Sequence, residues 1–189
     1  MKFQQFIVIP IIVAFLAFTI QILDQLLAPF MPVANAGFGW IAFISWAMYF
    51  MAGCNLQGGY KTLLGYVAGI FASIAIMKGG VALVPSLGFY AFPVAVFIVV
   101  IPCISLERIP PFDFVPALFV GAGIFFGLMS YVAGATFITA TVVELIYCVI
   151  GLAYGWATVF LRGKYEAYVA ASTASSELQE DAALQERHS

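Results

Sequence analysis

The sequence predicts an all-α integral membrane protein, a bundle of six transmembrane helices, and three observations carry that prediction. Of the 189 residues, 64% are hydrophobic and only 8% are charged, whereas a soluble domain is nearer half apolar and a quarter charged. The apolar residues form six runs, each near the roughly 20 residues that cross a bilayer core. The basic residues beside these runs fall mainly on one side of the membrane if all six cross it. We therefore expect lipid to surround residues 1–164.

The predicted helices follow one another with short connections. They span residues 6–23, 37–53, 60–77, 81–106, 114–135 and 136–161. The first is expected to stay in the protein, because polar Gln21, Asp24 and Gln25 lie at and after its end, where a signal peptide would have a small-residue cleavage site. The fourth contains three prolines, which predict kinks. The fifth and sixth are separated only by a short turn at Gly134–Thr136.

Positive charge predicts the orientation. Cytoplasmic segments of membrane proteins are enriched in lysine and arginine. With a cytoplasmic N-terminus, five of the six basic residues beside the helices are cytoplasmic and Lys78 alone lies outside; the five are Lys2, Lys61, Arg108, Arg162 and Lys164. Both termini are then cytoplasmic. Residues 165–189 are predicted to form an acidic cytoplasmic tail, disordered or weakly helical.

A short internal similarity predicts two inverted three-helix repeats. Residues Phe43–Phe50 align with Phe119–Phe126, since both segments begin with Phe and a β-branched residue and end on an aromatic pair. Each is followed by a glycine-containing connection and a helix with small residues four apart. Repeats of three helices must have opposite orientations in the membrane, as in many channels and transporters.

The same residues carry a resemblance to a known family. Trp46–Cys54, followed by Gln57–Lys61, and the later segment Phe114–Gly123 resemble the YcdZ-like family of small bacterial inner-membrane proteins. In this chain two extra residues separate Cys54 from the Gln-Gly-Gly run. The resemblance covers roughly residues 38–155 and implies a multi-pass protein of the bacterial inner membrane. The family is a domain of unknown function, so the resemblance implies no substrate.

Glu144 is the main candidate functional residue. It lies in the middle third of the sixth predicted helix, where a charge costs at least about 2.5–3.5 kcal/mol. We therefore expect its side chain to face the protein interior or a water-filled path, with Thr141 and Tyr147 near enough to hydrogen-bond the carboxyl. It is interpreted as a proton-coupling or solute-orienting carboxylate, with a hydrogen-bonded packing group or an interfacial position as the alternatives.

Two further groups are candidates for a solute path. The loop Gly53–Gly59 carries the amides of Asn55 and Gln57, which would either contact a polar solute or lie in an ordinary cytoplasmic turn. Five aromatic residues would either form paired pore constrictions or simply pack; they are Trp46, Tyr49, Phe50, Phe125 and Phe126. Small residues at helical spacing predict close helix contacts, within or between subunits; they are Gly65, Gly69, Ser73, Gly151 and Gly155.

The function predicted first is a passive channel or facilitator for a small polar solute, uncharged or a weak acid. The alternatives are a proton-coupled carrier that uses Glu144 and a non-transporting scaffold. We expect a homo-oligomer in the lipid bilayer, because six helices are few for a transporter acting alone. With a single histidine, His188, and no paired carboxylates or cysteine–histidine pattern, we expect no enzyme activity, metal or cofactor. The sequence contains no cluster of basic residues, so we expect no nucleic-acid binding.

Overall fold

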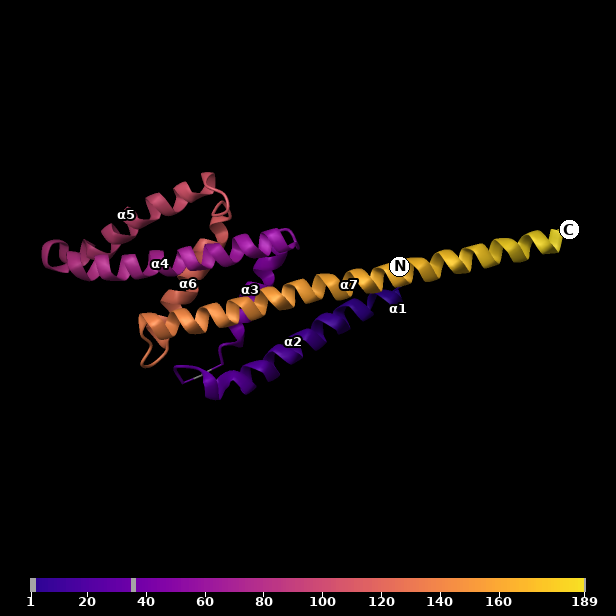
Figure 1. Ribbon diagram of the computed structural model, residues 1–189, viewed down its shortest axis with the longest axis horizontal. Coiled ribbons are helices and arrows are strands. Elements are labelled where there is room, and N and C mark those ends of the chain that lie inside the picture. Colours follow the sequence, from indigo (N-terminus) through magenta and orange to yellow (C-terminus); the bar gives the residue numbers. More distant parts are fainter. Residues whose placement is uncertain (1–2, 35–36, 189) are drawn as a thin grey trace. The chain divides into compact units, whose positions relative to one another are not determined.

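The computed structural model describes residues 3–34 and 37–188, with side chains described within 5–34 and 37–175. The described chain is helical and contains no strand (Figure 1). Its elements are α1 Phe3–Phe6, α2 Val8–Leu27, η1 Ala28–Phe30, α3 Gly39–Met51, α4 Leu56–Leu87, η2 Gly88–Tyr90, α5 Ala91–Ser105, η3 Leu106–Arg108, α6 Val115–Tyr131 and α7 Phe137–His188.

Three helical stretches are long and apolar enough to cross a membrane. They are Val8–Phe30, Leu56–Arg108 and Phe137–Ser175. The second contains both α4 and α5, which form an antiparallel hairpin through η2 (Figure 1). The helices α3 and α6 are shorter apolar helices. The chain is therefore a helical protein of the membrane type, as the composition predicts.

The residues at the helix ends explain where several helices begin. The side chain of Asn55 accepts a hydrogen bond of 2.8 Å from the Gly58 amide, which caps α4. Before α7, Thr136 and Thr139 exchange side-chain-to-amide hydrogen bonds of 2.8 and 3.2 Å, an arrangement resembling a capping box. A proline follows Phe114 in the first turn of α6, where its missing amide proton costs nothing.

The predicted boundary between the third and fourth helices is wrong. The sequence predicts a break between residues 77 and 81, but α4 continues to Leu87 and the chain turns at Gly88, whose φ is +50°. Gly79 and Gly80 lie inside the helix, and a Cβ on Gly80 would be 2.5 Å from the Phe92 ring. The glycine thus makes room for a ring of α5, whereas the sequence alone favours a turn there.

The C-terminal residues are helical along their backbone. The helix α7 continues to His188, where the sequence predicts a disordered or weakly helical tail. Its acidic residues Glu177, Glu180, Asp181 and Glu186 lie outside the part of the chain with described side chains.

Two compact units make up the chain. The first contains Met1–Thr19 and Ala157–Ser189; within it Tyr165 donates a hydrogen bond of 2.7 Å to the Gln5 carbonyl, and Arg162 pairs with Glu166 at 2.8 Å.

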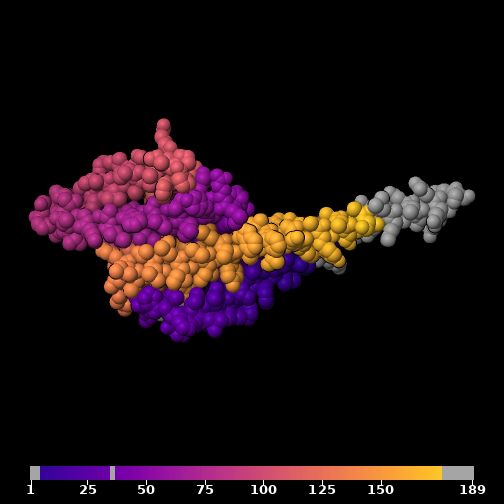
Figure 2. Space-filling model, viewed as in Figure 1, coloured from indigo at the N-terminus to yellow at the C-terminus, as the bar shows by residue number. Residues whose placement is uncertain are grey.

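The second unit, Ile20–Trp156, holds the candidate site. In it α4 packs against both α5 and α6, and the space-filling view shows α5 lying along α4 (Figure 2).

Candidate functional site

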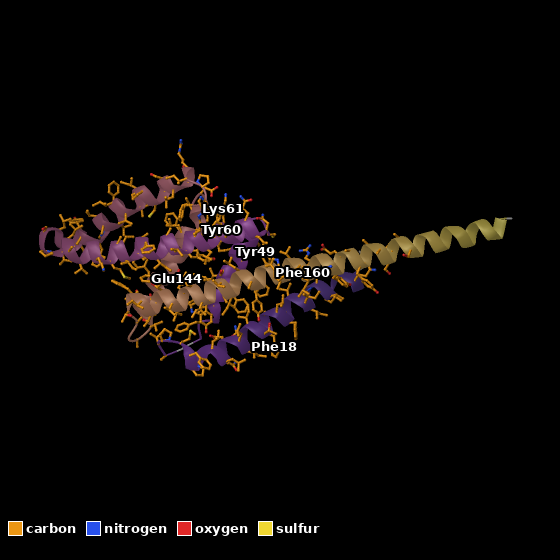
Figure 3. The ribbon with its side chains drawn as sticks, in the orientation of Figure 1. Phe18, Tyr49, Tyr60, Lys61, Glu144 and Phe160 are labelled. Carbon is orange, nitrogen blue, oxygen red and sulfur yellow. The ribbon has the colours of Figure 1, made fainter. Side chains whose placement is uncertain are left out.

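Glu144 lies on α7 and is completely buried (Figure 3). Neither carboxyl oxygen has a hydrogen-bond partner among the described residues. An ionised carboxylate without a partner would bear its full desolvation cost, so the neutral protonated form is the more stable one in this environment. The side chain of Glu144 therefore faces the protein interior, as the sequence predicts.

Buried polar groups from three helices lie near Glu144. Tyr66 of α4 and Cys148 of α7 are buried and within electrostatic range of its carboxyl. Ser45 of α3 lies beside both and donates a hydrogen bond of 2.7 Å to the Cys148 carbonyl. The Tyr66 hydroxyl, like the carboxyl, has no hydrogen-bond partner within the described chain. Glu144 thus belongs to a small polar cluster between α3, α4 and α7.

The predicted hydrogen bonds from Thr141 and Tyr147 to Glu144 are wrong. Thr141 donates to the carbonyl of Phe137, four residues earlier, at 2.7 Å, which is the usual bond of a threonine inside a helix. Tyr147 instead donates to an oxygen of Asp24, at the end of α2, at 2.5 Å. Both hydroxyls have closer acceptors than the carboxyl, which leaves Glu144 without these partners.

Asp24 is a second buried carboxyl, only 6% exposed, that the sequence does not identify as a site residue. A Cβ on Gly39 would lie 3.4 Å from its Oδ2, so the carboxyl lies against the first turn of α3. The ring of Phe38 contacts the Tyr147 ring edge-on, with centroids 5.8 Å apart. An acidic residue against a helix N-terminus is electrostatically favourable. The only signal in the sequence is an acidic residue at the end of an apolar helix.

Tyr147→Phe is expected to destabilise the protein by about 1–3 kcal/mol, because the substitution removes a hydroxyl that donates a hydrogen bond to a buried carboxylate. Thermal unfolding of the purified protein in detergent measures the change. Tyr131→Phe is the matched control, since Tyr131 is 90% exposed. Equal melting temperatures for Tyr147→Phe and the parent would show that the bond contributes nothing to stability.

Three of the five aromatic candidates lie in ring-packing contacts. Trp46 stacks on Phe43 with centroids 6.0 Å apart and also meets Phe50 and Tyr154. Phe125 is buried against Phe137. The other two candidates line apolar cavities: Tyr49 one of about 380 Å³ and Phe126 one of about 260 Å³. These contacts favour the packing interpretation of the rings over that of paired constrictions.

The loop before α4 is a capped turn with a polar cavity beside it. Asn55 caps the helix, and Gln57 is exposed in its first turn. Lys61, one turn later on α4 (Figure 3), forms an ion pair of 2.6 Å with Asp113. The hydrogen bond from Lys61 holds the pKa of Asp113 below its ordinary value. The sequence identifies Lys61 only as a cytoplasmic charge and does not predict its partner.

The small residues bring pairs of helices into backbone contact within one chain. A Cβ on Gly69 of α4 would overlap the Leu118 carbonyl oxygen of α6 and lie 2.5 Å from the Ala122 nitrogen. A Cβ on Gly151 of α7 would overlap the Ala42 carbonyl oxygen of α3 and lie 2.9 Å from the Trp46 nitrogen.

Three neighbouring small residues extend the same contacts. A Cβ on Gly65 would lie 2.6 Å from that of Ala117, and one on Gly155 would lie 2.6 Å from that of Tyr49. Ser73 donates a hydrogen bond of 3.2 Å to the Ala122 carbonyl. The predicted small-residue faces thus join α4 to α6 and α7 to α3.

Comparison with known proteins gives one match. Residues 6–162 match a family model described as "Protein of unknown function (DUF1097)". No curated protein and no solved structure matches the chain.

Proposed function

Since the chain belongs to the DUF1097 family, whose function is unknown, we propose its activity from the buried groups: it is a membrane carrier that moves a small polar solute together with a proton held at Glu144. One observation carries the proposal. A carboxyl on an apolar helix is fully buried with neither oxygen hydrogen-bonded among the described residues. Such a group is costly in a membrane protein, and a proton or solute pathway is the usual reason to retain it.

The passive channel, which the sequence places first, becomes the second candidate. Its main support is the set of aromatic pairs, and Trp46 and Phe125 lie in ring-packing contacts. The buried polar cluster around Glu144 favours coupling to protons over simple passage. A scaffold role requires no buried unpartnered carboxyl at all.

We also propose that helices α2–α4 and α5–α7 form the two inverted repeats. With Phe43 laid over Phe119, Ala42, Ser45 and Trp46 correspond to Leu118, Gly121 and Ala122. Gly151 lies against the residues of the first segment, Ala42, Ser45 and Trp46. Gly69 lies against the corresponding residues of the second segment, Leu118, Gly121 and Ala122. The glycine contacts therefore follow the register of the sequence repeat. This agreement supports a pseudo-two-fold axis in the membrane plane, of the kind found in transporters that alternate between two open states.

A topology of six crossings with both termini in the cytoplasm completes this proposal. A green fluorescent protein fused after Lys164 is expected to fluoresce, because that position is cytoplasmic. Alkaline phosphatase inserted in the Gly88–Tyr90 turn is expected to be active, because that turn lies on the other side. The two reporters exchanged between the sites serve as controls. Activity of one reporter at both positions would contradict the topology.

Two further proposals concern the membrane in which the protein resides and its oligomeric state. In line with the resemblance to the YcdZ-like family, we propose residence in a bacterial inner membrane. We propose a homo-oligomer as the working form, without enzyme activity or cofactor. Chemical crosslinking in native membranes tests the oligomer.

Proton movement in liposomes tests the main proposal. The purified protein is reconstituted in liposomes that contain the pH-sensitive dye pyranine, and small amino acids, hydroxy acids and polyols are added outside in turn. A coupled carrier is expected to acidify the lumen when its solute is present and to remain silent without it. Uptake of a radiolabelled solute that a protonophore leaves unchanged would overturn coupling and favour the passive channel. Absence of both proton movement and uptake across the whole panel would overturn transport.

A further inference from the structure

A cavity of about 320 Å³ with both charged and apolar side chains in its lining lies where the α3–α4 loop meets the start of α6. The residues that line it are Met51, Ala52, Gly53, Gly58, Lys61, Asp113 and Phe114. Ligand sites start at about 300 Å³, so the cavity suits a small molecule. Gly53 has a φ of +95°, and this backbone conformation, which L side chains rarely adopt, forms one wall of the cavity.

The charged side chains of the cavity keep unused hydrogen-bonding capacity. Lys61 reaches Oδ2 of Asp113 at 2.6 Å, and an ammonium group has three donors in all. The Oδ1 of Asp113 is buried and has no hydrogen-bond partner among the described residues. A buried acceptor of this kind is costly unless a donor is supplied. The pair therefore offers one ligand both a cationic donor and an anionic acceptor.

Charge balance selects the class of ligand. Lys61 and Asp113 neutralise each other, and the N-terminus of α4 adds a partial positive charge near the cavity. A carboxylic acid alone would place a second anion beside Asp113, and an amine alone a second cation beside Lys61. A zwitterion satisfies both side chains, with its carboxylate toward Lys61 and its ammonium group toward Asp113 Oδ1. The side chains of Phe114 and Met51 provide an apolar wall beside these charges.

We propose that this cavity binds a small α-amino acid with an apolar side chain. The inference rests on the proposed function in one respect, because it identifies the bound amino acid as the solute that is carried. Lys61 and Asp113 would then hold the solute near the start of α4, and Glu144 would supply the proton.

Calorimetric titration of the full chain in phosphatidylethanolamine–phosphatidylglycerol nanodiscs tests the site. L-alanine is the probe, and propionate and ethylamine are its controls because each keeps one of the two charged groups. We expect saturable binding of L-alanine and at least about tenfold weaker binding of each control, the factor that corresponds to about 1.4 kcal/mol. Equal affinities for L-alanine and propionate, or no binding of L-alanine, would overturn the proposal without any variant.

Asp113→Asn provides the second measurement. The amide has the shape of the carboxylate but not its charge, so L-alanine affinity is expected to fall about tenfold or more, while propionate loses its repulsive neighbour and binds no more weakly. Glu107→Gln is the matched control, since Glu107 is an exposed carboxylate six residues before Asp113 and outside the cavity. L-alanine affinity unchanged by Asp113→Asn would refute the site. Binding is measured without flux, so its failure leaves proton coupling at Glu144 intact, and intact binding without proton movement overturns transport alone.

Discussion

Alanine at Gly69 or at Gly151 is expected to destabilise the protein by about 3 kcal/mol, the upper part of the range for overpacking in a tight core. In both cases the new methyl group would overlap a backbone carbonyl oxygen of the crossing helix, at Leu118 or at Ala42. A backbone atom cannot rotate away as a side chain does, so the helices must separate. Separation also removes the close backbone contact that holds such helices together in lipid.

Size-exclusion chromatography and thermal unfolding in detergent measure this effect. Gly123→Ala is the matched control, because Gly123 is in α6 and a Cβ there meets nothing within 4 Å. The control is expected to be neutral or more stable by up to about 1 kcal/mol, the difference in helix propensity between alanine and glycine. Similar losses at Gly69 and Gly151 are expected if the two crossings are equivalent. Variants that elute and melt like the parent would show that the crossings tolerate a wider spacing.

Glu144→Gln is expected to reduce solute-driven proton movement to the level of protein-free liposomes. The amide keeps the size and hydrogen-bonding groups of the protonated carboxyl, but it cannot release a proton. Because neither carboxyl oxygen is hydrogen-bonded within the described chain, the substitution breaks no bond described there and should leave the melting temperature near that of the parent. Solute exchange without a gradient is expected to remain measurable.

The dye-loaded liposomes of the functional test provide the measurement, at two external pH values. Thr141→Val is the matched control on the same helix, since its hydroxyl bonds only the Phe137 carbonyl among the described contacts. The control should keep proton coupling. A Glu144→Gln protein that moves solute and protons like the parent would show that the carboxyl is a bystander and would return the passive channel to first place.

The sequence predicts the membrane class and most helix positions because apolar runs of bilayer length have few other uses. The small-residue faces could also be predicted, since a glycine every fourth residue on an apolar helix indicates close packing. The sequence does not show which helices meet. Only the structure shows that Gly69 contacts α6 and that Gly151 contacts α3. The predicted helix break near residue 79 is wrong because a pair of glycines inside a helix and a pair at a turn look alike in sequence.

The candidate site was predictable only in part. Glu144 stands out because a carboxylate interrupts an apolar run, and its burial follows from the cost of exposing it to lipid. Its surroundings depend on helices far apart in the chain. Asp24 bonds to Tyr147 across 123 residues, and Lys61 to Asp113 across 52. Such pairs arise from the way the helices pack, which one sequence does not specify.

The position of Glu144 on the last membrane-type helix affects how the chain is made. During synthesis α3 and α4 leave the ribosome before α7. Ser45 and Tyr66, which lie near the Glu144 carboxyl in the folded protein, are therefore made before Glu144 is translated. The cost of inserting a carboxyl-bearing segment into lipid therefore falls on a helix that can dock at once onto helices made before it. A chain shortened before α7 would lack the Cys148 carbonyl that accepts the hydrogen bond of Ser45, so this polar group of α3 would lose its partner.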